Sequence, residues 1–355
     1  MTVSGVKTAL IAMSGGVDSS VAAILAARMG YECTGVTMLL APDDESLCSA
    51  RSDVLNLNNY DAAEVAKKLG IPHQTLDFRR EFGEGVIEPF VSSYLKGETP
   101  NPCVNCNAEI KFGLLYEYAR SHGFDKLITG HYANIVKEAG ENFRLAKASD
   151  TGKDQSYFLY SVTPEKLKHI LFPLGGLTKN EVRRIAADEG LFYADRDESQ
   201  DICFIPEGGY AAFIERYSGK SSVPGNYIDL SGKIIGRHKG ISRYTIGQRK
   251  GLGIALGRPV FVKEIRYETN EIVLSDEEDV FTGQIEIGEI VMHTEVPAYA
   301  GVMIRYRADP VRAAIKQISE SHLLAAFDKP VRAPASGQAA VLYDGDLVIG
   351  GGRIV

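Results

Sequence analysis

Two groups of residues in this 355-residue sequence have the chemistry of an active site: a serine- and glycine-rich turn near the beginning, and the cysteines. The turn, Ser14-Gly-Gly-Val-Asp-Ser-Ser20, follows an apolar run from Ala9 to Met13 that is typical of a buried parallel strand. Apolar residues at helical spacing follow from Val17 to Met29. Strand, glycine turn and helix together predict a phosphate cradle, because free N–H groups at a helix start point at an anion. An ordinary strand–helix turn with a capping Ser or Asp is the simpler interpretation.

The turn differs from a Walker loop, whose closing lysine reaches the outer phosphates of a nucleotide. Asp18 stands near the place of that lysine. A carboxylate is stable among phosphates only with a cation between them, so Asp18 predicts Mg²⁺ bridging a triphosphate.

Cys103 and Cys106 lie in the stretch Thr99-Pro-Asn-Pro-Cys-Val-Asn-Cys, which two prolines and two asparagines indicate to be a stiff, exposed loop. A helix is expected at 108–121, so Cys106 would lie just before its start, where a thiolate is favoured. Three interpretations of Cys103, Cys106 and the distant Cys203 are open. They are inert buried thiols, or a metal site that lacks a second CxxC pair, or partners in sulfur chemistry that lie close in space.

The amino-acid composition limits the class of protein and the compartment in which it acts. With 45% hydrophobic residues the chain can bury a core, and its net charge of −7 gives no global signature of nucleic-acid binding. No apolar run of about eighteen residues predicts a membrane span, and the first residues do not resemble a signal peptide. Five cysteines in a chain of this length fit a reducing compartment. We therefore expect a cytoplasmic protein, without a membrane partner and monomeric.

The order of the expected elements indicates an α/β fold with further β domains. Strands and helices alternate over the first 130 residues or so, which predicts a doubly wound parallel sheet whose ligands bind beyond the carboxyl ends of the strands. The polar stretch 42–60 is expected to be a loop before a helix at 61–69. After residue 208 short strands replace helical patterns. We place three domains at 1–208 (nucleotide-binding and catalytic), 209–281 (small, basic and mostly β) and 282–355 (a β-barrel).

The middle domain carries a basic segment that can bind phosphates. Between Lys233 and Arg258 there is no acidic residue, and glycines keep the backbone accessible. The basic residues of this segment are Lys233, Arg237, Lys239, Arg243, Arg249, Lys250 and Arg258. We expect charge reversal at Arg243 or Arg249 to weaken RNA binding. A merely solubilising surface would mix both signs of charge.

The motifs, taken in order, closely resemble those of the bacterial tRNA 2-thiouridylases, which belong to the PP-loop ATP pyrophosphatases. The turn at Ser14 resembles the PP-loop, and the resemblance extends from residue 7 to residue 353. The other motifs are Thr99-Pro-Asn-Pro with Cys106-Asn-Ala-Glu-Ile-Lys-Phe, Thr129-Gly-His-Tyr, Lys153-Asp-Gln-Ser-Tyr-Phe, Ser199-Gln-Asp-Ile-Cys-Phe and Gly350-Gly-Gly.

This resemblance implies a reaction and its residues. The enzyme would use ATP and Mg²⁺ to adenylate the 2-carbonyl oxygen of the wobble uridine of tRNA. Sulfur would then come from a persulfide on Cys203, with Cys106 as the nucleophile, and the two cysteines can join as a disulfide during turnover. A persulfide relay protein or cysteine desulfurase would supply the sulfur. The implied fold is an adenine nucleotide alpha hydrolase-like domain.

The resemblance also implies the binding residues. ATP would be bound by Ala12, Met13, Ser14, Gly15, Gly16, Val17, Asp18, Ser19, Met38 and Gly130. The target base would meet Asn101, Pro102 and Cys103, and other parts of the tRNA would meet His131, Lys153, Asp154, Gln155, Arg305, Tyr306 and Gln338.

Many family members have Asp where this chain has Cys103. The change puts a third thiol beside the pair, so Cys103, Cys106 and Cys203 could hold an iron–sulfur cluster. Two further alternatives are another PP-loop ligase or amidotransferase, which would need no paired cysteines, and a tRNA-binding module with a degenerate nucleotide loop. The paired cysteine motifs and the intact turn argue against these two.

Overall fold

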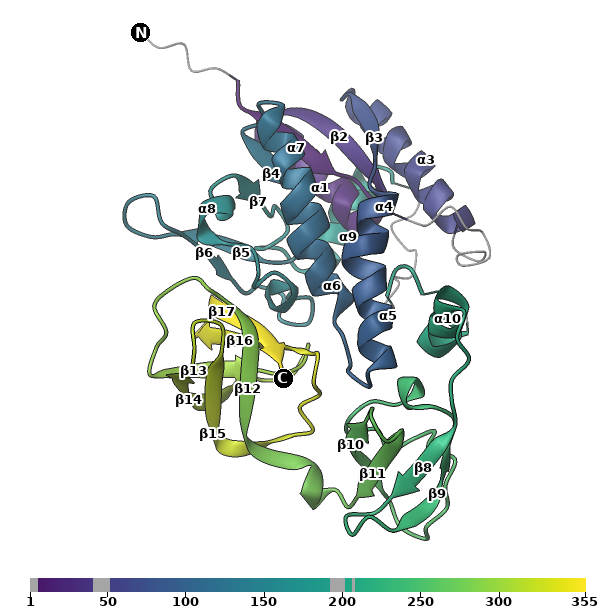
Figure 1. The fold of residues 1–355 in the computed structure, drawn as a ribbon. Helices are drawn as coiled ribbons and strands as arrows, with labels where there is room; N and C mark the ends of the chain where they lie inside the picture. Colours follow the sequence, from purple (N-terminus) through teal and green to yellow (C-terminus); the bar gives the residue numbers. More distant parts are fainter. Residues whose placement is uncertain (1–5, 41–51, 192–201, 206–207) are drawn as a thin grey trace. The chain divides into compact units, whose positions relative to one another are not determined.

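The computed structural model describes the backbone of residues 6–40, 52–191, 202–205 and 208–355, and their side chains except those of 52–60. Cys48 and residues 199–201 of the last cysteine motif lie outside the described residues. The chain divides into two compact units, which we describe separately (Figure 1). The first comprises 1–85, 103–206 and 346–348, and the second 86–102, 207–345 and 349–355.

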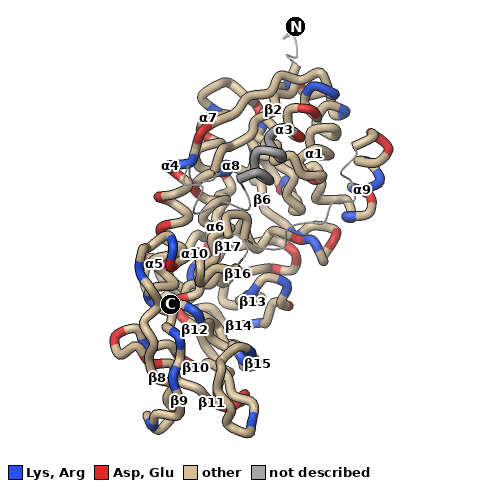
Figure 2. Tube along the Cα trace, turned by 90° about the vertical axis from the view of Figure 1, so that its right-hand side faces the viewer, with Lys and Arg blue, Asp and Glu red and all other residues tan. Residues whose placement is uncertain are grey.

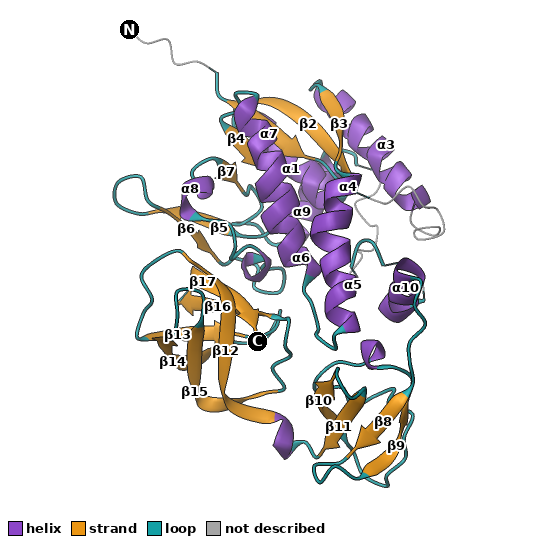
Figure 3. Ribbon diagram, in the orientation of Figure 1, coloured by secondary structure: helices purple, strands orange, loops and turns teal. Residues whose placement is uncertain are grey.

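The first unit contains a parallel sheet with β1 at its centre. Strands β2, β3, β4 and β7 of this sheet are labelled in Figure 3. In the order of the sheet its strands are β3 (His73–Asp77), β2 (Glu32–Leu39), β1 (Thr8–Ala12), β4 (Lys126–Ile128) and β7 (Ile170–Leu171). Ala9 of β1 is in register with Cys33 of β2 and with Lys126 of β4. Because every pairing is parallel, the carboxyl ends of all these strands lie at one edge of the sheet.

Helices cover this sheet and give it its core. α1 (Val17–Arg28), α3 (Ser52–Leu69) and α9 (Lys179–Asp188) bury apolar residues together with Ile11 of β1 and with Met13, the residue after that strand. α7 (Leu115–Ser121) packs against β4 (Figure 1). The expectation of a doubly wound parallel sheet is confirmed.

The remaining elements of the first unit are short. They are α4 (Arg79–Phe82), α8 (Pro164–Leu167), the hairpin β5 (Asn134–Lys137) and β6 (Phe143–Ala146), the 3₁₀ turn Ser156–Phe158, and the π-helical segment Cys106–Leu114. α6 (Pro102–Asn105) begins at the last residue of the second unit and leads directly into that π-helical segment.

Two expected loops are wrong where the structure describes them; residues 42–51 of the first lie outside the described residues. α3 begins at Ser52, so 52–60 is helical. The asparagines of this stretch favour turns and therefore suggested a loop. The Ser-Asp pair at its start is typical of a helix N-terminus. The helix expected from residue 108 begins at Pro102. Proline at the first position of a helix lacks only an N–H that would have had no partner there. Asn101-Pro102 is therefore a helix start rather than part of a stiff loop.

The second unit contains two β structures. A four-stranded sheet has the order β10 (Phe261–Arg266), β11 (Glu271–Ser275), β8 (Gly225–Ile228) and β9 (Ile234–His238). A closed antiparallel barrel has the order β12 (Phe281–Met292), β15 (Leu323–Arg332), β14 (Val311–Gln317), β13 (Tyr299–Met303), β16 (Ala339–Asp344) and β17 (Leu347–Ile354). The pairing of Gly288 with Arg353 is part of the β12–β17 contact that closes it. The expected C-terminal β-barrel is confirmed.

This unit also contains the helices α5 (Glu88–Leu95) and α10 (Gly209–Ser218) and the 3₁₀ turns Ile241–Arg243 and Glu278–Val280. The rings of Tyr94 and Tyr210 stack between them with centroids 4.6 Å apart. Among the described residues, no helix has both the length and the apolar character needed to cross a bilayer.

Candidate active site

The loop after β1 is shaped by its own hydrogen bonds. Gly15 has φ +75°, a backbone conformation that favours glycine. The hydroxyl of Ser19 accepts a hydrogen bond from the backbone N–H of Ser14 at 3.2 Å and donates one to the carbonyl of Gly16 at 3.0 Å. Ser19 is buried, whereas Ser14 and Gly16 are exposed. Ser19 therefore holds the loop from inside, and Ser14 stands where an anion can reach it.

The residues expected to bind ATP lie together at the carboxyl ends of neighbouring strands. The loop follows β1, Met38 is the penultimate residue of β2, and Gly130 follows β4. A Cβ on Gly130 would lie 2.8 Å from both the backbone N of Ser19 and the carbonyl carbon of Asp18. Only glycine permits this approach without a backbone shift, so Gly130 fixes the distance between the two segments.

The Asp18 carboxylate has two partners from other parts of the first unit. Its Oδ1 accepts hydrogen bonds from the ammonium of Lys179 at 2.7 Å and from the Tyr132 hydroxyl at 2.9 Å. Lys179 is 7% exposed, and its Nζ lies 5.9 Å from the centroid of the Tyr132 ring. The expected carboxylate at the loop is thus paired with a buried lysine that sequence reasoning missed.

Lys179 reaches the loop because α1 and α9 pack side by side. The helices are joined at both ends: Asp18 meets Lys179 at their N-terminal ends, and Arg28 meets Glu189 at 2.6 Å at the other. Thr178-Lys-Asn-Glu forms a capping box, with a 2.8 Å bond from the Thr178 N–H to the Glu181 carboxylate. That motif is legible in the sequence and marks Lys179 as the first residue of a helix. It does not show which helix lies beside it.

Cys106 lies one turn inside the helical run from Pro102, and it is 8% exposed. Burial raises the pKa of its thiol, and the nearby Lys111 ammonium partly opposes that rise. The expectation of a thiolate favoured by a helix start is therefore wrong for this structure, because burial is the larger effect. Cys103, one turn earlier, is exposed, although surrounding protein raises the pKa of its thiol as well.

Cys203 is exposed, unlike Cys106, and both residues are free thiols. The ring of the next residue, Phe204, meets Phe82 of α4 edge-on with centroids 5.7 Å apart. α4 also packs against the Cys106–Leu114 segment. The two cysteines, widely separated in sequence, thus belong to segments that contact the same short helix.

Within the described part of the chain, no three His, Cys, Asp or Glu side chains are grouped so as to hold a metal ion. Cys103, Cys106 and Cys203 do not form such a group.

His131, Lys153, Asp154 and Gln155, which are expected to contact tRNA, lie in the first unit. His131 is 8% exposed and is hydrogen-bonded to Thr129 at 2.6 Å. Asp154 is buried and accepts a 2.7 Å bond from the Ser156 hydroxyl. Gln155 exchanges hydrogen bonds with the backbone of Tyr132, at 2.8 and 2.9 Å. Because Tyr132 donates to Asp18, Gln155 connects the Lys153–Gln155 motif to the nucleotide loop.

In the second unit, the barrel holds the segment that precedes the cysteines. The Gln338 side chain donates to the carbonyls of Thr99 at 3.0 Å and Pro100 at 3.3 Å. The N–H of Thr99 bonds to the carbonyl of Ser336 at 2.8 Å. Gln338 therefore lies beside the segment leading to Asn101 and Pro102.

Arg305 and Tyr306, the other expected tRNA contacts of this unit, follow β13. The Arg305 guanidinium donates to the carbonyls of Arg332, at 3.0 Å, and Ala333. The Arg307 guanidinium lies 5.3 Å from the Tyr306 ring centroid.

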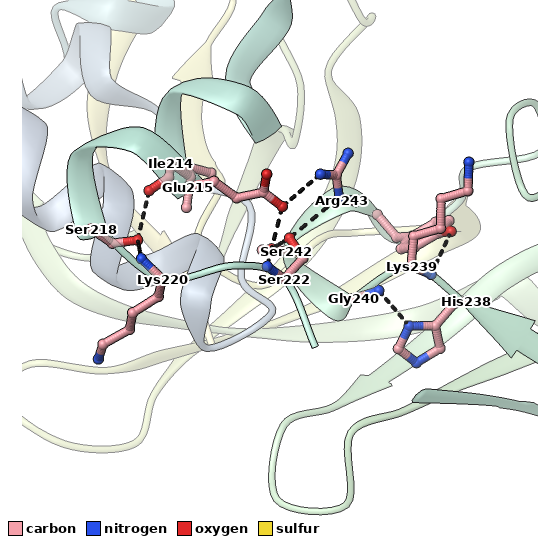
Figure 4. A network of polar contacts seen from close by, with 11 residues as sticks. Ile214, Glu215, Ser218, Lys220, Ser222, His238, Lys239, Gly240, Ser242 and Arg243 are labelled. Atoms are coloured by element: carbon pink, nitrogen blue, oxygen red, sulfur yellow. Dashed lines mark hydrogen bonds and ion pairs between the residues drawn. The ribbon is translucent and has the colours of Figure 1, made fainter. Parts of the chain in front are cut away.

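The basic segment of the second unit is partly neutralised by acidic residues outside it. Arg243 lies 2.5 Å from Glu215 of α10, and its Nε donates to Ser222 at 3.3 Å (Figure 4). Arg258 pairs with Asp276. The segment's exposed basic residues other than Arg258 are Lys233, Arg237, Lys239, Arg249 and Lys250. Figure 2 colours the lysines and arginines blue along the chain.

Three family models match consecutive parts of the chain. Residues 7–207 match the tRNA methyl transferase HUP domain, 211–276 the tRNA methyl transferase PRC-barrel domain, and 290–354 the aminomethyltransferase beta-barrel domain. A tRNA-specific 2-thiouridylase MnmA of Lachnoclostridium phytofermentans is 44% identical over 98% of this chain and 99% of its own. The chain belongs to the tRNA-specific 2-thiouridylase family.

Other members of this family are equally similar. Proteins of the same name from Clostridioides difficile and Moorella thermoacetica are 45% and 46% identical, over 98% and 97% of this chain and 98% of each relative. A solved 4-thiouridine synthetase–RNA complex with bound ATP has 17% identity and a TM-score of 0.37, covering 60% of this chain and 50% of that chain, and is too distant to support an argument.

Within a 2-thiouridylase, Arg243 and Arg249 are expected to behave differently, in contrast to the expectation from sequence. Arg249→Glu should weaken tRNA binding about tenfold and lower its salt dependence by about one phosphate contact, because Arg249 is exposed. Arg243→Glu should chiefly destabilise the protein, because it faces Glu215. Filter binding over a salt series, with melting temperatures, separates the two effects.

Lys67→Glu, an exposed lysine of α3, is the matched control and should leave tRNA binding within about twofold. Equal weakening by Arg249→Glu and Lys67→Glu would contradict a local phosphate-binding surface.

Proposed function

We propose that this protein is an ATP-dependent tRNA-uridine 2-sulfurtransferase, which replaces the 2-oxygen of the wobble uridine with sulfur. The proposal is carried by one observation: a phosphate-binding type of loop and two cysteine segments that meet on α4 occur in one α/β unit. A methyl transferase, the activity in the description of the family model, would need neither feature.

The loop serves the first half of the reaction. The 2-carbonyl carbon of uracil is a poor electrophile and its oxygen a poor leaving group. Attack of that oxygen on the α-phosphorus of ATP releases pyrophosphate and turns the oxygen into part of AMP, which leaves easily. Backbone N–H groups of the loop and the exposed Ser14 would bind the phosphates. Lys179 would supply the positive charge that a Walker loop takes from its own lysine.

Mg²⁺ fits the same place through Asp18. Mg²⁺ in nucleotide sites is commonly held by one or two carboxylates together with the substrate phosphates, so a single carboxylate suffices. When bound, it would neutralise charge on the leaving pyrophosphate. The Asp18 carboxylate would then exchange Lys179 for the metal, and the lysine would be released toward the phosphates.

The cysteines serve the second half. A persulfide on Cys203 attacks C2 of the activated base through its outer sulfur, and AMP leaves. The Cys106 thiolate then attacks the inner sulfur of Cys203. This breaks the persulfide bond, leaves the outer sulfur on the base and forms a Cys106–Cys203 disulfide. An external thiol must reduce this disulfide before another persulfide is received.

The tRNA and the sulfur donor are the macromolecular partners. A wobble uridine is already unpaired in its loop, so extruding it costs little. Lys153, Asp154, Gln155, Arg305, Tyr306 and Gln338 would contact the tRNA. Protein partners of Asp154, Gln155, Arg305 and Gln338 hold these side chains in place. A persulfide carrier would load the exposed Cys203. The protein would act in the cytoplasm as a monomer.

Sulfur transfer to tRNA tests this proposal. Purified protein, ATP, Mg²⁺ and a persulfide donor should convert the wobble uridine of a substrate tRNA to 2-thiouridine, detected by mass spectrometry of nucleosides. One AMP and one pyrophosphate should form for each sulfur transferred. A tRNA with cytidine at the wobble position is the matched control and should gain no sulfur.

AMP formation without sulfur in the base would indicate a different PP-loop ligase. A methylated uridine would overturn the proposal. Anaerobically purified protein that needs iron for this activity would support a cluster-dependent version of the same reaction, and full activity without iron would exclude it.

A further inference from the structure

The segment Cys106–Leu114 is π-helical, which changes which side chains share a face. In a π-helix each carbonyl bonds to the N–H five residues later, as in the bond from the Leu115 N–H to the carbonyl of Ile110. Lys111 follows Cys106 by five residues and therefore lies one π-turn beyond it on the same side. An ordinary α-helix would rotate residue 111 away from residue 106.

The Lys111 ammonium is held by a buried histidine. Its Nζ lies 3.3 Å from Nε2 of His131, and Nδ1 of His131 lies 2.6 Å from the Thr129 hydroxyl. The His131 ring packs beside those of Phe112 and Phe172, with centroids 5.7 and 5.9 Å away. Burial, with the charge of Lys111, lowers the pKa of His131 well below its usual value, so the ring is neutral. A neutral ring that accepts from Lys111 at Nε2 carries its proton at Nδ1 and donates it to Thr129.

The charge of Lys111 acts on both thiols of this segment. Burial raises the pKa of Cys106 and of Cys103, and Lys111 opposes the rise in each case. The lysine thus lies where it stabilises a negative charge on either sulfur.

Three other elements or positions bring charged groups near this segment. Glu109 lies on the segment itself and meets Gly85, and burial raises the pKa of its carboxyl. On α4, Arg80 and Glu81 pair with each other at 3.0 Å. From α8, Lys166 donates to the carbonyl of Phe112 at 2.7 Å.

We infer that Lys111 is a positioning residue that stabilises the Cys106 thiolate, and that neutral His131 aims its ammonium at the sulfur. The role in catalysis rests on the proposed function, in which Cys106 must become a thiolate to attack the inner sulfur of Cys203. A neutral acceptor is essential, because a protonated histidine would repel the lysine. Ionisation releases the Cys106 proton to solvent, and no oxidant or reductant is needed.

The pH dependence of Cys106 alkylation tests this inference without tRNA. The protein is treated with iodoacetamide from pH 6.5 to 10, and labelling of each cysteine is followed by peptide mass spectrometry. Lys111→Met should move the Cys106 profile to higher pH and slow its labelling at pH 7.5 about tenfold, because each unit of pKa changes the thiolate fraction tenfold. Lys111→Arg should recover much of the wild-type rate of Cys106 labelling, and His131→Leu should lower that rate about threefold.

Lys166→Met is the matched control, since it removes another lysine that touches the same segment, and it should leave the Cys106 profile unchanged. Melting temperatures identify any variant that is not folded, and Lys111→Gln replaces Lys111→Met in that case. An unchanged Cys106 profile in a folded Lys111 variant would overturn the inference.

Thiolation assays separate this inference from the proposed function. Lys111→Met should lower kcat with a shift of its pH profile to higher pH, while KM for ATP stays constant. A merely structural role would lower kcat equally at every pH and would contradict the inference. If the wild type labels as expected but transfers no sulfur, the proposed function fails and the assignment of Lys111 to the thiol stands.

Discussion

Cys203→Ser is expected to abolish sulfur transfer, with a loss of at least about a thousandfold, because a serine oxygen cannot carry a persulfide. Cys203 is exposed, as a sulfur that must receive sulfur from another protein has to be. Its removal should leave ATP binding unchanged, since the loop at Ser14 is formed by other hydrogen bonds. Radiolabelled persulfide donor and tRNA measure the two steps of loading and transfer separately.

Cys106→Ser should fail at a different step. The variant should accept labelled sulfur on Cys203 but complete no turnover, because nothing resolves the bond between the two sulfurs. Cys33→Ser is the matched control: Cys33 is buried in β2, and its thiol donates to the carbonyl of Tyr31 at 3.3 Å. It should transfer sulfur at nearly the wild-type rate. Full thiolation by both Cys106→Ser and Cys203→Ser would refute the relay.

Lys179→Met is expected to slow formation of pyrophosphate about a hundredfold, the usual effect of removing one preorganised charge donor from a transition state. Lys179 is buried and meets Asp18 at 2.7 Å, so the loop loses its positive charge and Asp18 keeps the Tyr132 hydroxyl. Pyrophosphate release in a single turnover measures this step directly. Lys179→Arg should release pyrophosphate at a rate between those of the wild type and Lys179→Met, because the positive charge is kept but the shape of the side chain changes.

Arg28→Met provides the matched control for Lys179→Met. Arg28 and Glu189 form the other ion pair between α1 and α9, and the Arg28 side chain is 54% exposed. An exposed pair adds little stability, so this variant should form pyrophosphate within about twofold of the wild type. If both variants slow the step equally, Lys179 merely joins two helices and does not act on phosphate.

Local sequence patterns were sufficient to predict the type of fold and the phosphate-binding character of the loop. A short apolar strand, two glycines and a helix can form only a narrow range of structures, since period and turn chemistry are local properties. The same holds for the barrel, whose short alternating strands are legible without knowing their partners. Sequence-based prediction failed where one stretch fits two local structures. Asn101-Pro102 is compatible with a loop and with a helix start, and in the structure a helix begins at Pro102.

Contacts between side chains that are distant in sequence, and the effect of burial on those side chains, could be seen only in the folded chain. Lys179 reaches Asp18 because α9 lies beside α1. Glu215, which lies outside the basic segment, pairs with Arg243 inside it. The electrostatic state of Cys106 depends on burial and on the π-helical turn that brings Lys111 to its side. The burial of a side chain and its charged partners depend on residues from many parts of the fold, so they cannot be predicted from a local sequence pattern.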